Sequence, residues 1–309
     1  MSKAFSGIAL NSPIADSDLV YCASFEALYG LSDERRAYFT EKQAELRRFL
    51  VEPTSLYDDT KLRVIHAKRD HLANHDFDPT SSTSAFEEVR VDFVHSTARY
   101  EGNTMSVQEV SDLLHQDMVA PGRSMSEHLE VTDIAAGFDM VVRNVKEGEA
   151  FSVESLLELH EVAAAHLADC GAGEFRWDQR YVTGSPVLPP PPALCAPIVE
   201  ALVAWYNDEP SFERACLFHL VFEDCHPFQD GNGRTGRLVL NQMLMSLGFP
   251  ATALKVTEEV TREYYRSIRA FTEDFDRRDG TSMVSLIADA VDEALSKPLL
   301  EIEQASAQK

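Results

Sequence analysis

Apolar residues recur every three to four positions along most of this 309-residue chain, the spacing that is typical of amphipathic helices. In the stretch from 85 to 101, Phe86, Val89, Phe93 and Tyr100 fall on one stripe. No series of evenly spaced, alternating strand patterns interrupts this period. The pattern therefore predicts an all-α protein. The predicted helices cover residues 32–50, 61–75, 85–101, 106–115, 127–146, 152–167, 196–206, 211–225, 234–247, 257–275 and 281–295.

Turn-forming residues divide this helical pattern. The stretch Phe77-Asp-Pro-Thr-Ser-Ser-Thr-Ser84 is rich in side chains that compete for backbone hydrogen bonds, so it predicts a loop. We place a boundary there, between a helical extension (1–84) and a main domain (85–300), followed by a tail (301–309). The role of the extension is not encoded in an obvious motif, and it could serve a homodimer contact.

Residues 171–194 differ from the rest of the chain. They contain Gly-Ala-Gly, then the β-favouring run Arg180-Tyr-Val-Thr-Gly184, then four prolines at 189–192. This order predicts a short β-hairpin flap that is followed by a rigid, extended segment.

Charge and composition exclude several classes of protein. The chain has 51 Asp and Glu against 28 Lys and Arg, a formal net charge of -23, which would repel a nucleic-acid backbone. No apolar run approaches the roughly 20 residues of a membrane span, and the amino terminus lacks a signal-peptide pattern. Five cysteines without a C-x-x-C spacing argue against a disulfide framework or a zinc ribbon, so we expect a reducing, cytoplasmic location.

The candidate chemistry is concentrated in His226-Pro-Phe-Gln-Asp-Gly-Asn-Gly-Arg-Thr-Gly-Arg237. Pro227 disfavours helical geometry at His226, so an apolar helix should end there. A glycine-rich loop, Gly231-Asn232-Gly233, then leads into a new helix near Arg234. Because unpaired N–H groups and the helix dipole both favour negative charge, this helix start is a candidate anion site.

The side chains of this segment supply complementary functions. The Asp230 carboxylate is a hard oxygen ligand for a Mg²⁺ ion, and that ion would also bind phosphate oxygens. Arg234 and Arg237, three residues apart, would share one helix face as a clamp for phosphate oxygens. His226 is the group here that can accept a proton near neutral pH. Together they predict phosphoryl or nucleotidyl transfer.

Other readings of the motifs are weaker. Gly231 to Gly236 satisfies G-x-G-x-x-G, but a helical pattern precedes it, whereas a dinucleotide site needs a preceding strand. No P-loop sequence is present. His75-Asp76 is a dipeptide that metal phosphohydrolases use, yet a convincing set of further ligands cannot be assembled. A regulator that binds nucleotide without turnover is the remaining alternative.

The segment His226-Pro-Phe-x-Asp230-Gly-Asn-Gly-Arg234-x-x-Arg237 resembles in full the motif of the Fic family (filamentation induced by cAMP). The resemblance extends over roughly residues 90–295 and includes Leu159-His160, the flap, and the pair Tyr264-Tyr265. It implies an all-α Fic fold whose members mostly transfer AMP from ATP to a protein hydroxyl.

The resemblance also implies roles for individual residues. His226 would deprotonate a Ser, Thr or Tyr hydroxyl of the target, and Asp230 would hold Mg²⁺ on the α- and β-phosphates. The remaining nucleotide contacts would come from the phosphate cradle, the arginine clamp and an adenine-facing tyrosine, that is, from Gly231, Asn232, Gly233, Arg234, Gly236, Arg237, Tyr264 and Tyr265.

Partner and donor follow from the same resemblance. The flap would dock a target protein as an added strand, or the chain would modify itself. Thr272 stands where relatives often carry a polar amide, so a donor other than ATP stays open. In some family members the same site removes AMP, which also stays open.

A second motif predicts a built-in inhibitor. Thr97-Ala-Arg-Tyr-Glu101-Gly102 resembles the family's [ST]-x-x-x-E-[GN] inhibitory sequence, with the inhibitory helix at 85–102. Glu101 would pair with Arg237 and occupy the guanidinium that should orient the γ-phosphate. We expect Glu101→Gly to release the activity.

Overall fold

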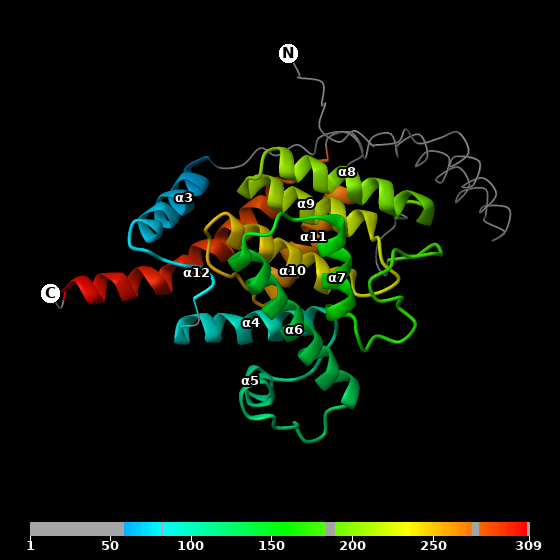
Figure 1. Cartoon of the computed structure of the whole chain (residues 1–309), viewed down its shortest axis with the longest axis horizontal. Coiled ribbons are helices and arrows are strands. Elements are labelled where there is room, and N and C mark those ends of the chain that lie inside the picture. Colours follow the sequence, from blue (N-terminus) through cyan, green and yellow to red (C-terminus); the bar gives the residue numbers. More distant parts are fainter. Residues whose placement is uncertain (1–58, 82, 183–188, 274–277, 308–309) are drawn as a thin grey trace, which may run out of the picture.

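A computed structural model of the chain describes residues 59–81, 83–182, 189–273 and 278–307 (Figure 1). The described residues form α-helices joined by turns, with no strand among them. The all-α class is therefore confirmed. The helices are α3 (Asp59–Ala73), α4 (Ser84–Tyr100), α5 (Val107–Gln116), α6 (Met125–Glu147), α7 (Val153–Ala163), α8 (Cys195–Asp208), α9 (Phe212–Cys225), α10 (Asn232–Ser246), α11 (Glu258–Glu273) and α12 (Thr281–Ala307), with one 3₁₀ turn, η1 (Pro192–Leu194).

The predicted helix at 32–50 lies outside the described residues. Most other predicted ends agree within two residues, and two differ by four residues or more. Helix α7 stops at Ala163, four residues early, where the chain turns back toward α6 and the Asp133 carboxylate accepts hydrogen bonds from the backbone N–H and Nδ1 of His166. Helix α12 continues to Ala307 although Pro298 lies inside it, so most of the predicted tail is helical.

Helix α10 is the centre of the fold, and it packs against α9, α6, α4 and α7 (Figure 1). Nearly all of its side chains are buried. The apolar ones, such as Leu238 and Leu244, lie in the same core as Phe138 of α6 and Phe222 of α9. Because α9 and α10 are fixed side by side, the turn between them is held at both ends. This turn is the segment 226–231.

Helix α3, the described part of the extension, packs along α12 (Figure 1). Lys61 pairs with Asp289 and Lys68 with Asp292, both at 2.6 Å, over the buried side chain of Ile65. The domain boundary near residue 84 stays a prediction.

The segment 171–182 lies across the α9–α10 turn without forming a strand, and residues 183–188 lie outside the described part of the chain. The β-hairpin therefore stays a prediction. No helix in the described ranges is long and apolar enough to cross a membrane.

Candidate active site

His226 ends helix α9 in a left-handed conformation, with φ of 49° and its N–H bonded to the Phe222 carbonyl at 2.9 Å. A positive φ is uncommon for a residue with a side chain, so other contacts must hold it. Arg176 supplies them, because its Nε donates to the His226 carbonyl at 2.8 Å and its backbone N–H donates to the Pro227 carbonyl at 2.9 Å.

The imidazole of His226 hydrogen-bonds the Glu223 carbonyl, which leaves its other ring nitrogen to accept a proton. Burial, together with the nearby Arg176 charge, lowers the pKa of His226 to about 4. The ring is therefore neutral at pH 7, the form that a general base requires.

The side chain of Asn232 hydrogen-bonds the backbone of the loop that follows His226. Its Oδ1 accepts from the Phe228 N–H at 2.8 Å, and its Nδ2 donates to the Phe228 carbonyl at 2.9 Å. The residue is only 2% exposed. Its side chain thus shapes the loop, and the phosphate cradle assigned to the backbone of 231–233 stays a prediction.

The loop leads into α10, and the side chain of Asp230 in this loop is exposed to solvent. Asp230 is exposed, and its Oδ1 accepts from the Gly231 N–H at 2.7 Å. Gly231 has φ of +78°, a conformation that favours glycine, and it is the residue before the first turn of α10. The free N–H groups of that turn therefore follow directly after Asp230.

His160 of α7 connects the loop to the segment 171–182. The Gly173 N–H donates to its Nδ1 at 3.0 Å, so the proton lies on Nε2, which donates to the Asp230 carbonyl at 3.0 Å. The ring stacks on Phe228 at a centroid distance of 3.7 Å. Burial lowers the pKa of His160 to about 4, so this neutral tautomer persists.

Sequence reasoning missed the positioning roles of His160 and Arg176. Both belong to motifs that the resemblance covers, at Leu159-His160 and Glu174-Phe-Arg176. Arg176 hydrogen-bonds a backbone carbonyl 50 positions away, and His160 hydrogen-bonds one 70 positions away. The local sequence shows the residue type but not the partner.

Glu101 lies against Arg237. It follows the last residue of α4, and its Oε1 accepts from Arg237 Nη2 at 2.5 Å, with side chains 23% and 5% exposed. The same guanidinium lies 5.0 Å from the centre of the Tyr100 ring. A Cβ on Gly233 would come within 2.7 Å of Glu101 Oε1, so glycine leaves the room for this ion pair.

Arg234 points to a different partner. Its Nη2 donates to Glu130 Oε1 of α6 at 2.6 Å, and its Nη1 donates to the Ala163 carbonyl at 3.4 Å. The residue is 3% exposed. The two arginines therefore do not form one open clamp here, since each is paired with its own carboxylate. Gly236, between them, is buried where α10 packs on α9.

The tyrosine pair is divided between core and surface. Tyr264 is 1% exposed, and its hydroxyl lies 2.9 Å from His219 Nε2. Tyr265 is 49% exposed, and its hydroxyl donates to the Tyr100 carbonyl at 3.3 Å. Of the two, Tyr265 is the ring that a bound nucleotide could reach.

A cavity of about 340 Å³ opens beside Asp230 and Arg234. Five of its eleven lining residues are acidic, among them Glu101, Glu127 and Glu130. In the described residues no cluster of three or more His, Cys, Asp or Glu side chains could hold a metal ion without other ligands. A divalent ion at Asp230 would thus need ligands from a bound phosphate group.

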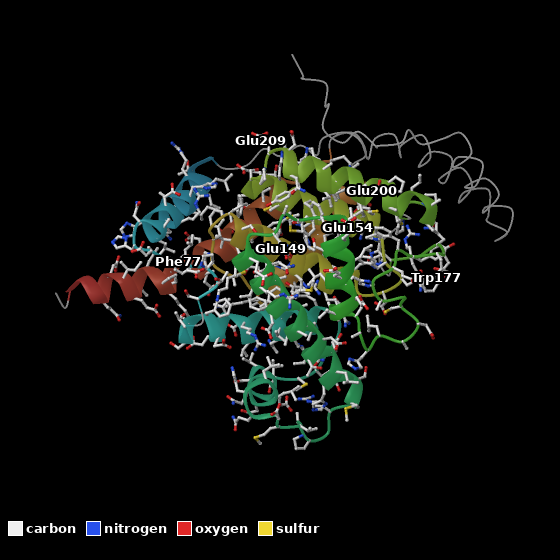
Figure 2. The ribbon with its side chains drawn as sticks, in the orientation of Figure 1. Phe77, Glu149, Glu154, Trp177, Glu200 and Glu209 are labelled. Carbon is white, nitrogen blue, oxygen red and sulfur yellow. The ribbon has the colours of Figure 1, made fainter. Side chains whose placement is uncertain are left out.

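A second cavity, of about 320 Å³, lies between the α3–α4 connection and α12, where Phe77 is located (Figure 2). It is lined by none of the residues of the 226–237 turn.

Part of the chain matches a known protein family. Residues 150–244 match the model of the Fic/DOC family. The chain is similar to the protein adenylyltransferase fic-1 of Caenorhabditis elegans, with 34% identity over 69% of this chain and 42% of the relative. It is also similar to the protein adenylyltransferase Fic of Drosophila ananassae, with 29% identity over 77% of this chain and 47% of the relative. The chain spans about half the length of these curated relatives.

Solved structures share the fold. Fic-1 (residues 134–508) of C. elegans aligns with a TM-score of 0.63 and 29% identity, covering 92% of this chain and 81% of that one. A Fic-domain-containing signalling protein from Bacteroides thetaiotaomicron aligns with a TM-score of 0.67 at 19% identity, covering 77% of this chain and 95% of that one.

Proposed function

Because the chain contains a Fic/DOC family domain, we propose that it is a protein adenylyltransferase, which transfers AMP from ATP to a hydroxyl group of a protein. One observation carries the proposal. The α9–α10 turn brings three groups onto one loop: a neutral imidazole at His226 with one ring nitrogen able to accept a proton, an exposed carboxylate at Asp230, and the amino-terminal N–H groups of α10. These are a proton acceptor, a cation ligand and an anion site.

In the proposed reaction, the target's hydroxyl oxygen bonds to the α-phosphorus of ATP, and the bond from that phosphorus to the pyrophosphate oxygen breaks. The hydroxyl proton passes to the free ring nitrogen of His226, and pyrophosphate leaves. Positioning and charge stabilisation by the protein would supply most of the rate. The loop's rigidity, from Asn232 and His160, supports such positioning.

The residues present fit a bound Mg²⁺. Asp230 is exposed and keeps one carboxylate oxygen clear of the Gly231 N–H, which suits an ion that takes a single carboxylate and completes its shell with phosphates and water. The ion would supply positive charge against the phosphates. Tyr265 would lie along the nucleotide, and Arg237, once free, would orient the γ-phosphate.

The wild-type chain is proposed to be autoinhibited. The Glu101 carboxylate occupies Arg237 Nη2 at 2.5 Å, and the walls of the adjoining cavity carry further carboxylates. A triphosphate would compete with Glu101 for the guanidinium and would be repelled by this lining. The same site could also remove AMP or take another donor.

The target is proposed to be a protein that docks on the segment 171–182, or the chain itself. Arg176 and Gln229, which hydrogen-bonds Arg180, hold this segment against the catalytic turn. Trp177 projects from it at the edge of the molecule and is 55% exposed (Figure 2). An exposed aromatic next to the reacting loop is a suitable anchor for a polypeptide.

The test is intact-mass measurement of the wild type, Glu101→Gly and Glu101→Gly/His226→Ala after incubation with ATP and Mg²⁺. We expect Glu101→Gly to gain the mass of AMP, the wild type to gain little, and the double variant to gain none. Equal gain in the wild type would contradict autoinhibition. No gain in any variant, with ATP still bound by Glu101→Gly, would contradict self-modification and favour a different donor, AMP removal or a silent binding module.

The reverse reaction can be followed with the same materials. AMP-modified Glu101→Gly protein is freed of nucleotide and mixed with unmodified wild type and Mg²⁺. Loss of the added mass with release of AMP would assign removal to the wild-type site.

A further inference from the structure

The turn that follows Glu101 is fastened to α6 by a buried asparagine. Asn103 is 3% exposed, and its Nδ2 donates to Glu130 Oε2 at 2.8 Å and to the Glu127 carbonyl at 3.0 Å. Its Oδ1 accepts from the Met105 N–H at 3.0 Å, which shapes the turn itself. One side chain therefore joins the end of α4 to the first turns of α6.

Thr104 strengthens the same attachment. Its N–H and hydroxyl both donate to Glu127 Oε1, at 2.9 and 2.5 Å. The other oxygen of Glu127 accepts from the N–H and hydroxyl of Ser124 at the start of α6. The position of this turn is thus set by α6 and not by α4 alone.

Glu130 links this attachment to the candidate phosphate site. It accepts from Asn103 through Oε2 and from Arg234 through Oε1. The second arginine, Arg237, is held by Glu101, two residues before Asn103. Both arginines of the motif are therefore paired with carboxylates that are connected to the turn after α4: Glu101 precedes this turn, and Glu130 is hydrogen-bonded to it through Asn103.

We propose that Asn103 is the positioning residue that holds Glu101 against Arg237, with Glu130 as its anchor on α6; the consequence for activity rests on the adenylyltransferase function proposed above. Glu101 needs such a restraint. It lies at the carboxyl end of α4, where the helix dipole disfavours a carboxylate and the last turn tends to fray. Without the attachment, the Glu101 carboxylate would leave the guanidinium more often.

The decisive variant is Asn103→Asp. An aspartate keeps the oxygen that accepts from the Met105 N–H, so the turn can form. It replaces the Nδ2 donor by an oxygen facing Glu130 Oε2 and the Glu127 carbonyl, which turns two attractions into repulsions. We expect a rate of AMP transfer at least about tenfold above the wild type, the scale of one lost hydrogen bond to a charged group.

The matched control is Asp139→Asn, which also weakens a contact between α6 and α4. Asp139 accepts two hydrogen bonds from Arg90, at 2.7 and 2.8 Å, far from the Glu101 end of α4. This variant should leave the inhibited rate unchanged. Asn103→Asp should also have no effect when Glu101→Gly is already present, because the carboxylate that it positions is then absent.

Two readouts separate this inference from the proposed function. Hydrogen exchange of the amides at 98–104 should be faster in Asn103→Asp and unchanged in Asp139→Asn, whether or not AMP is transferred. Unchanged exchange would overturn the inference. So would a wild-type rate in Asn103→Asp beside an active Glu101→Gly, or equal activation by Asn103→Asp in both backgrounds. An inactive Glu101→Gly would instead count against the proposed function, and exchange alone would then decide the positioning role.

Discussion

At the residue scale, burial determines which groups at the turn carry protons. Burial lowers the pKa values of His226 and His160 to about 4, and both rings are bonded to backbone atoms. A neutral His226 can accept a proton, and a neutral His160 can donate to the Asp230 carbonyl. The protonation states of these two rings therefore follow from the desolvation that each undergoes in the fold.

The pH dependence of AMP transfer follows from His226. In the Glu101→Gly variant, we expect a rate that is flat from pH 8 to pH 5 and falls by half near pH 4, because protonation removes the accepting lone pair below that pKa. Initial rates in overlapping buffers measure this, with circular dichroism at each pH to confirm folding. A midpoint near 6.5, the ordinary value for histidine, would mean that the ring is hydrated in the active form.

At the element scale, the segment 171–182, helix α7 and the α9–α10 turn act as one unit. His160 bonds Gly173 on one side and the Asp230 carbonyl on the other, while Arg176 bonds the His226 and Pro227 carbonyls. These contacts connect three elements through backbone atoms. The position of the loop thus depends on how α7 is packed.

Replacing His160 tests this connection. His160→Phe keeps a ring on Phe228 but leaves the Gly173 N–H and the Asp230 carbonyl without their partner, which should lower stability by about 2–4 kcal/mol, a cost for two unsatisfied buried groups. In the Glu101→Gly background, AMP transfer should also fall, because Asp230 and the α10 amides would no longer be held in place. Urea unfolding and initial rates measure the two effects.

The control is His128→Phe in the same background. His128 is also buried and bonds two backbone groups, the Ala120 N–H at 2.9 Å and the Ser124 carbonyl at 2.7 Å, but on α6. It should lower stability without lowering the rate. If both variants lower the rate equally at a temperature where both are folded, His160 has no specific role in positioning the loop.

At the scale of the whole molecule, histidines with lowered pKa values link stability to pH. The pKa values of His160 and His226 are lowered to about 4 and that of His219 to about 3, in each case chiefly by burial. The unfolded chain binds these protons near pH 6.5, before the folded chain does. Their contribution to stability is therefore complete above pH 6.5 and is lost as the pH falls toward 4.

Glu223 has the opposite effect on how stability depends on pH. Burial raises its pKa to about 7, so its contribution is complete below pH 4.5 and is lost as the pH rises through 7. Burial also lowers the pKa values of His66 and His95 and raises that of Glu130, so between pH 6.5 and 4.5 five histidines oppose two carboxyl groups. We therefore expect the melting temperature to fall as the pH is lowered from 6.5 to 4.5. Each histidine would lower the free energy of unfolding by up to about 1.4 kcal/mol per pH unit. Calorimetry at pH 7, 6 and 5 checks this, and a rising melting temperature would contradict it.

The sequence alone predicted most helices and the location of the site. Helix periods and the His226–Pro227 break depend on neighbouring residues, so α5, α9 and α10 could be placed within a few positions. The same local information missed the passage of α12 through Pro298, beyond which Leu299 and Ile302 still pack against the core.

Only the tertiary structure decided what each site residue contacts. Arg234 is paired with Glu130, 104 positions away, Asn232 closes its own loop, and Tyr264 is buried while its neighbour Tyr265 is half exposed. Nor did any local pattern indicate that Asn103 joins the turn after Glu101 to α6. The physical reason is range, since turns and helix faces depend on adjacent residues, whereas these pairings depend on how distant helices pack.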